Sequence, residues 1–169
     1  MKTIIAIFFA LGVFLASLVT SAQSKSDKMY NTFDNKEGVT SLSFSKNMVD
    51  VVDIDLDDEI DENNVTGDLK EVRFMSYNPK KGEISGSEFT KKAIGLLPKS
   101  AYKKYEGDED NDLEIWLSGR KKKFKECHVF THSNKDDQLR FVVSFYGKFT
   151  VNDIEDLKNS GRNYAESEN

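Results

Sequence analysis

Hydrophobic and polar residues alternate most clearly in the last third of the chain. Two alternating sets predict two strands with apolar residues on one side: Leu113, Ile115 and Leu117, and then Leu139, Phe141, Val143 and Phe145. The segment between them, 124–132, is also rich in strand-forming residues. The separating segments 118–122 and 133–137 are short and polar, and short links favour antiparallel neighbours. The pattern predicts a three-stranded antiparallel meander.

Other segments have the apolar spacing of helices. Segment 26–36 carries Met29, Tyr30 and Phe33. A second helix is predicted from Ser87 to the region of Pro98, with an apolar stripe formed by Phe89, Ala93, Ile94 and Leu97. Thr150 and Asp153 have capping-box spacing ahead of a third helix. Segments 39–45 and 69–77 are typical of strands, 46–52 of a brief helix, and 101–106 of either a helical turn or a short strand.

These elements predict an α+β fold. The expected architecture is a mixed sheet that ends in the meander, with the helices packed on one face, because each strand has one strongly apolar side. We expect one domain over residues 23–160 and a flexible polar tail over 161–169.

The first 22 residues have the layout of a secretory signal peptide. Met1-Lys2-Thr3 is cationic, the next sixteen residues to Val19 carry no charge, and Thr20-Ser21-Ala22 ends in small residues. Cleavage is expected before Gln23. A membrane span needs about 20 apolar residues, and a run of sixteen is short for one, so cleavage is favoured over a retained membrane anchor. No stable span is expected after cleavage. The sequence therefore predicts export to the periplasm or the extracellular space.

The single cysteine and the net charge disfavour some kinds of cross-link, anchor and partner for this chain. Cys127 is the only cysteine and lies deep in the domain, so neither an intrachain disulfide nor a lipid anchor after the leader is expected. The net charge of −5 disfavours nucleic acid and anionic lipid at long range. Arg120-Lys121-Lys122-Lys123 is a local exception, typical of a solvated hairpin turn, with a phosphate or polyanion contact as the alternative.

An acidic run over 53–62 resembles part of a calcium loop. Candidate ligands fall at positions 1, 3, 5 and 9 of such a loop: Asp53, Asp55, Asp57 and Asp61. The pattern fails where glycine and a bidentate carboxylate are needed, because Asp58 and Asn64 occupy those positions. A solvated acidic loop and weak calcium binding are the two interpretations.

The two histidines provide the main candidates for catalysis. His128 and His132 lie in a strand-like segment, where four residues span about 13 Å, too far to share a metal ion. We find no motif for a cofactor or a phosphate-binding loop. A small hydrolase that pairs one histidine with a carboxylate remains the alternative to a non-catalytic protein.

Two aromatic residues provide the candidate binding surface. Trp116 and Tyr146 lie on the strand faces opposite the main apolar sets, so they would form a docking platform if one sheet face were open. Ordinary cross-strand packing is the alternative. The favoured function is a non-catalytic interaction module, with an envelope protein or a second copy of the chain as its partner.

Several stretches resemble a family of exported Gram-negative bacterial proteins. They are the first helix with Met29 and Phe33, Glu37-Gly38-Val39-Thr40, Ser45-Lys46-Asn47-Met48, Leu69-Lys70-Glu71-Val72, and VVSFYGKFTVNDIEDL at the end. The family is domain of unknown function 4252. The resemblance implies an envelope location and a small helix-plus-sheet domain, and it supplies no catalytic residues. Many such proteins are lipid-anchored, but this chain lacks the required cysteine.

Overall fold

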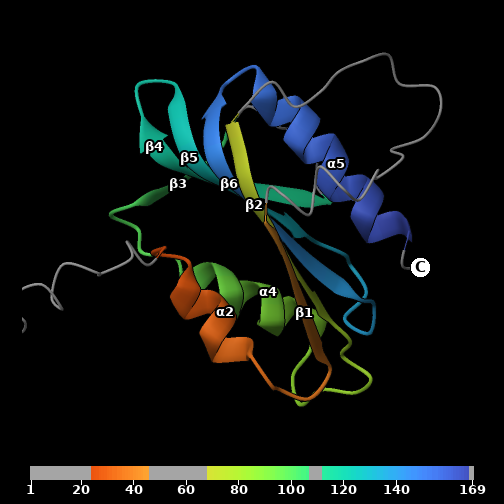
Figure 1. The fold of residues 1–169 in the computed structure, drawn as a ribbon. Coiled ribbons are helices and arrows are strands. Elements are labelled where there is room, and N and C mark those ends of the chain that lie inside the picture. The colour runs from red at the N-terminus through yellow and green to blue at the C-terminus, as the bar shows by residue number, and fades with distance from the viewer. Residues whose placement is uncertain (1–23, 46–67, 107–111, 168–169) are drawn as a thin grey trace, which may run out of the picture.

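An antiparallel sheet organises the molecule (Figure 1). The computed structural model describes residues 24–45, 68–106 and 112–167. Its strands are β1 (Val39–Ser45), β2 (Asp68–Tyr77), β3 (Tyr102–Lys104), β4 (Leu113–Arg120), β5 (Lys123–Thr131) and β6 (Arg140–Thr150). Helices of the described residues are α2 (Asp27–Phe33), α4 (Gly86–Gly95) and α5 (Asp153–Ser167). The α+β class is thus confirmed.

The six strands lie in the order β1-β2-β6-β5-β4-β3, and every neighbouring pair is antiparallel. The predicted meander is β4, β5 and β6, and β3 extends it at the edge. A mixed sheet was the wrong expectation, because β2 runs antiparallel to β6. Helix α4 follows β2 in the chain and packs on one face of the sheet. It carries the chain from β2 toward β3 at the far edge.

Helices cover both faces of the sheet, not one as expected. Apolar residues of α2 and α4 pack with alternate residues of the strands on one side, among them Met75, Phe130 and Val142. We call this side the α2/α4 face. On the opposite side, the α5 face, Ile154 and Leu157 pack over residues such as Val143 and Phe145. The apolar residues of the α5 face include the predicted sets, such as Leu113, Ile115 and Leu117. Those of the α2/α4 face were missed because polar residues such as Glu126 and His128 interrupt them on the strands.

Side-chain hydrogen bonds form at the starts of α4 and α5. Helix α4 begins two residues earlier than predicted, because Ser85 and not Ser87 accepts a hydrogen bond from the amide of Glu88, at 3.2 Å. Before α5, the amide and hydroxyl of Thr150 donate to a carboxylate oxygen of Asp153, at 2.5 and 2.8 Å. Because α5 continues to Ser167, the expected domain boundary after residue 160 falls inside this helix.

Three predicted segments fall outside the described residues, namely the leader over 1–22, the brief helix over 46–52 and the acidic run over 53–62. Within the parts of the chain that are described, no helix is both long enough and apolar enough to cross a membrane.

Candidate functional site

A buried group of polar side chains lies between α2 and the sheet. Residues at alternate positions of a strand share one face, so β5 places Glu126 and His128 on the α2/α4 face. The register pairs His128 with Ser144 and Glu126 with Tyr146 of β6. The polar cluster consists of Ser24, Ser26, Tyr30, Tyr102, Glu126, His128, Ser144 and Tyr146.

Glu126 is the charged centre of the polar cluster. One of its carboxylate oxygens accepts hydrogen bonds from the hydroxyls of Tyr102 at 2.6 Å, Ser24 at 2.9 Å and Ser26 at 3.2 Å. Burial alone would raise the pKa of Glu126, but the neighbouring His128 and these hydroxyl donors outweigh it and lower the pKa to about 2. The carboxylate is therefore ionised at neutral pH, and it accepts hydrogen bonds from β3 and from the start of α2.

His128 is fully buried beside it. Its Nδ1 lies 2.7 Å from the Ser144 hydroxyl, and its Nε2 lies 3.4 Å from the nearer carboxylate oxygen of Glu126. The hydroxyl of Tyr30 donates to the Ser144 oxygen at 2.6 Å. The proton of the Ser144 hydroxyl can therefore be donated to Nδ1 of His128. Burial lowers the pKa of His128. A lowered pKa favours the neutral imidazole at neutral pH. Its buried Nε2 forms no hydrogen bond within the described residues, although a carboxylate oxygen of Glu126 lies 3.4 Å away.

Helix α2 closes the polar cluster. The hydroxyls of Ser26 and Tyr146 lie 2.8 Å apart. Arg73 of β2 forms ion pairs of 2.6 Å with Asp27 of α2 and with Glu71. Its guanidinium also lies 4.8 Å from the centre of the Tyr146 ring, within the range of a cation–π contact. These contacts join the start of α2 to β2 and β6.

The groups of a hydrolytic triad are present, but the arrangement does not favour hydrolysis. Serine, histidine and carboxylate stand in series in Ser144, His128 and Glu126. A nucleophilic serine needs access to its substrate and donors for the oxyanion. Ser144 and His128 are both 0% exposed, and Tyr30 already occupies the Ser144 oxygen. The geometry instead ties α2 to the sheet.

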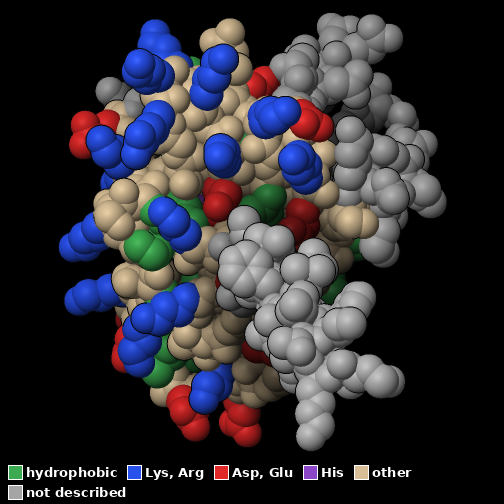
Figure 2. Space-filling view, turned by 60° about the vertical axis from the view of Figure 1, so that its left-hand side comes forward, with side chains coloured by type: hydrophobic (Ala, Val, Ile, Leu, Met, Phe, Trp, Pro, Cys, Tyr) green, Lys and Arg blue, Asp and Glu red, His purple; other side chains and the backbone are tan. Residues whose placement is uncertain are grey.

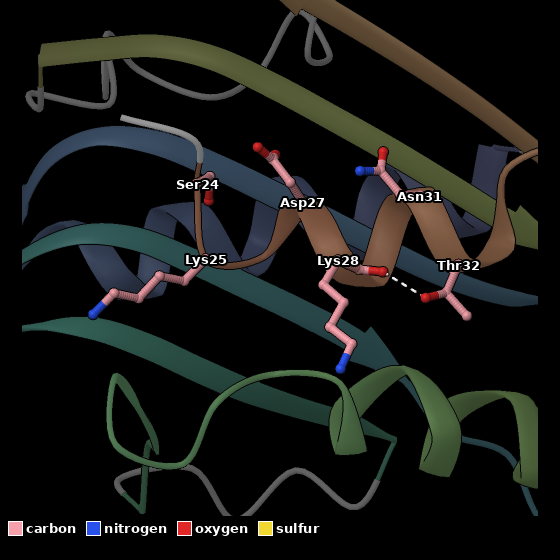
Figure 3. Close-up of a pocket in the computed structure, with 6 residues that line it drawn as sticks. All are labelled: Ser24, Lys25, Asp27, Lys28, Asn31 and Thr32. Carbon is pink, nitrogen blue, oxygen red and sulfur yellow. Dashed lines mark hydrogen bonds between the residues drawn. The ribbon is translucent and has the colours of Figure 1, made fainter. Parts of the chain in front are cut away.

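A shallow hollow of about 410 Å³ lies on the outer side of α2 (Figure 3). Its described lining is Ser24, Lys25, Asp27, Lys28, Asn31 and Thr32. Two of these side chains are already engaged, since Ser24 binds Glu126 and Asp27 binds Arg73. Thr32 donates to the backbone carbonyl of Lys28 at 2.6 Å, as the dashed line shows. The hollow therefore presents mainly two lysines and an asparagine to solvent.

The structure places the two predicted docking aromatics on the same face, which is covered by α2 and α4. Tyr146 is only 8% exposed. Trp116 is half-buried against the α2/α4 core, and its indole N–H donates to Glu114 at 2.7 Å. Strand β5 separates β4 from β6, so the two rings do not lie on neighbouring strands. Binding by either residue stays a prediction.

The remaining candidates lie apart from one another. His132 has its own carboxylate, with Nε2 at 3.2 Å from Glu114, whereas His128 faces Glu126. The candidate calcium ligands, Asp53, Asp55, Asp57 and Asp61, lie outside the described residues. Within the described residues no three potential ligand side chains are grouped closely enough to hold a metal ion.

Sequence reasoning missed most of the polar cluster. Glu126 and His128 alternate on β5, and Ser144 and Tyr146 alternate on β6, so the signal was two neighbouring strands with polar residues on the same side. That signal is hard to separate from a solvent-facing side. The contribution of Ser24, Ser26 and Tyr30 depends on how α2 folds back, which no local pattern reveals.

Comparison with known proteins gives one match. The profile of a family described as Domain of unknown function (DUF4252) matches residues 30–157. No curated protein matches, and no solved structure matches.

Proposed function

We propose that this chain, which belongs to the DUF4252 family of unknown function, is an exported interaction module of the bacterial envelope. It would act by binding an envelope protein or a second copy of itself. Export is supported by the charged, apolar and small-residue segments of the first 22 residues. Cleavage before Gln23 would leave Ser24 and Ser26 in the mature chain, where they hold the start of α2 on Glu126.

One observation supports binding over catalysis. The side chains with the most reactive arrangement, Ser144 and His128, are 0% exposed and are engaged in hydrogen bonds to each other and to Tyr30. A substrate could reach them only if α2 left the sheet. Leaving would break the bonds to Glu126 and the ion pair between Arg73 and Asp27. Binding through exposed side chains is therefore favoured over catalysis at Ser144 and His128.

The proposal is tested by crosslinking in intact cells that produce the native protein. The captured species are identified by mass spectrometry, with an unrelated exported protein as the control. We expect a specific envelope protein, or a crosslinked pair of this chain. Capture of cytosolic proteins alone would contradict the proposal.

A further inference from the structure

The positive charge of the described residues is concentrated on one part of the surface. The whole chain has a net charge of −5, but the described residues carry more Lys and Arg than Asp and Glu. Figure 2 shows Lys and Arg side chains gathered over the upper part of one face, the side where β4 and β5 form their hairpin in Figure 1. The negative net charge of the whole chain therefore does not describe this part of the surface, which is positively charged.

The β4–β5 hairpin carries four consecutive cations of this surface, residues 120–123. Arg120 pairs with Lys123 across the hairpin, and Lys121 and Lys122 form the two-residue turn between them. The backbone angle φ is 52° at Lys121 and 64° at Lys122, as a type I′ turn requires. The hairpin closes tightly here, because a Cβ on Gly119 would lie 2.2 Å from the carbonyl oxygen of Lys123. The four cations therefore lie together at the tip of the hairpin.

Lysine is a poor choice for both turn positions. Left-handed backbone brings Cβ close to the following carbonyl oxygen, so type I′ turns favour Asn-Gly. Strain of this kind marks positions where something other than local stability determines the residue. The feature that Lys121 and Lys122 add to the turn is charge, directly beside Arg120 and Lys123.

On one side of the hairpin, neighbouring strands extend the charged surface. On the other side, Lys123 pairs with Thr150 of β6, which precedes the acidic first turn of α5. Lys103 on the edge strand β3 and Lys125 on β5 are both exposed. Within the described part of the chain, neither these two side chains nor those of residues 120–123 form an ion pair. Glu126, which follows Lys125, points into the polar cluster. We call Lys103, Arg120, Lys121, Lys122, Lys123 and Lys125 the cationic hairpin patch.

We propose that the cationic hairpin patch docks the protein on a membrane surface rich in anionic phospholipid headgroups. The inference rests on the proposed function, since an exported envelope protein meets such surfaces, and it names one partner of that function. A projecting tip with clustered cations suits a flat anionic surface. Single-stranded polyanions are bound along grooves with exposed aromatic rings, whereas Trp116 and Tyr146 lie beneath helices.

The attachment is electrostatic and peripheral. Among the described residues, Leu42 on β1 is the large hydrophobic side chain that is exposed. Strand β1 is the opposite edge of the sheet from β3, so Leu42 does not accompany the patch. With no apolar anchor at the tip, binding depends on counterion-sensitive charge attraction alone.

The test measures cosedimentation of the full chain, as isolated from cells, with phosphatidylcholine vesicles that contain or lack phosphatidylglycerol. We expect binding to the anionic vesicles, loss of that binding in molar salt, and much weaker binding to the neutral ones. Equal binding to both kinds of vesicle would overturn the proposal and point to the apolar leader as the attachment.

The decisive variant is Lys121→Asn with Lys122→Gly, which installs the preferred turn sequence and removes two charges. Its thermal stability should equal or exceed that of the wild type, so lost binding cannot be attributed to misfolding. We expect affinity for anionic vesicles to fall by about tenfold to thirtyfold. The matched control, Lys80→Gln with Lys81→Gln, removes two lysines from the loop after β2 and should bind nearly as the wild type does.

Two results would overturn the proposal. One is unchanged vesicle binding in the Lys121→Asn/Lys122→Gly variant. The other is an equal loss in the control, which would show that only total charge matters. Either failure leaves the crosslinking result in intact cells untouched, so failure of membrane docking is distinguishable from failure of the interaction-module proposal.

Discussion

Glu126 is the residue on which the start of α2 depends most. Its ordinary pKa is 4.5 and its pKa in the folded chain is about 2. A lowered pKa stabilises the fold at pH values above the ordinary pKa, and this stabilisation is lost as the pH falls toward 2. The carboxylate is mostly shielded, with a side-chain exposure of 15%. Acid should therefore loosen the contact of α2 with the sheet.

The first prediction concerns Glu126→Gln. Between pH 7 and pH 3 the wild type should lose about 2 kcal/mol more unfolding free energy than the variant, because only the wild type carries this carboxylate. Urea denaturation at the two pH values measures the difference. Parallel pH profiles for the two proteins would show that Glu126 is not held ionised by its donors.

The second prediction concerns Ser144→Ala. The substitution leaves Nδ1 of His128 without its partner and leaves the hydroxyl of Tyr30 only its 3.3 Å bond to the carbonyl of Arg73, so unfolding free energy should fall by about 1–3 kcal/mol. Ser76→Ala, at a half-buried position of β2 outside the polar cluster, is the matched control and should cost less. If Ser144→Ala instead abolished a hydrolytic activity of the purified protein at unchanged stability, the structural role assigned here would be wrong.

At the scale of elements, the helices differ in how much of their attachment is polar. Helix α2 has seven residues, too short to be stable alone, and it combines buried Met29, Tyr30 and Phe33 with the serine bonds to Glu126. Helix α4 is held mainly by its apolar stripe, which includes Phe89 and Ala93. Loss of serine hydroxyls should therefore affect α2 selectively.

The third prediction concerns Ser24→Ala with Ser26→Ala. Amide hydrogen exchange should accelerate across 27–33, with little change across α4 and α5, because only α2 loses donors to Glu126. The comparison variant is Ser85→Ala, which removes the α4 N-cap and should accelerate exchange at the start of α4. Uniform acceleration in both variants would mean that the helices do not open independently.

Local patterns predicted the elements better than their arrangement. The alternation of Leu113, Ile115 and Leu117 located β4, and the capping signal at Thr150 located α5. The pairing of β2 with β6 joins segments far apart in the sequence, and no local signal specifies it. The coverage of both faces was missed for a related reason. Residues such as Glu126 and His128 have the polarity of a solvated face, and only the fold shows that α2 buries them.

At the scale of the whole molecule, charge and reactivity are separated. The polar cluster is enclosed between α2 and the sheet, whereas the cationic hairpin patch lies at the surface end of β4 and β5. The polar cluster attaches α2 to the sheet, and the cationic hairpin patch is available to partners. This division supports the proposed role in binding.

Export is the claim on which that proposal depends, and N-terminal sequencing of the native protein after cell fractionation tests it most directly. We predict that the protein is recovered outside the cytoplasm and that its sequence begins at Gln23. Recovery from the cytosol with Met1 or Lys2 as the first residue would contradict the account.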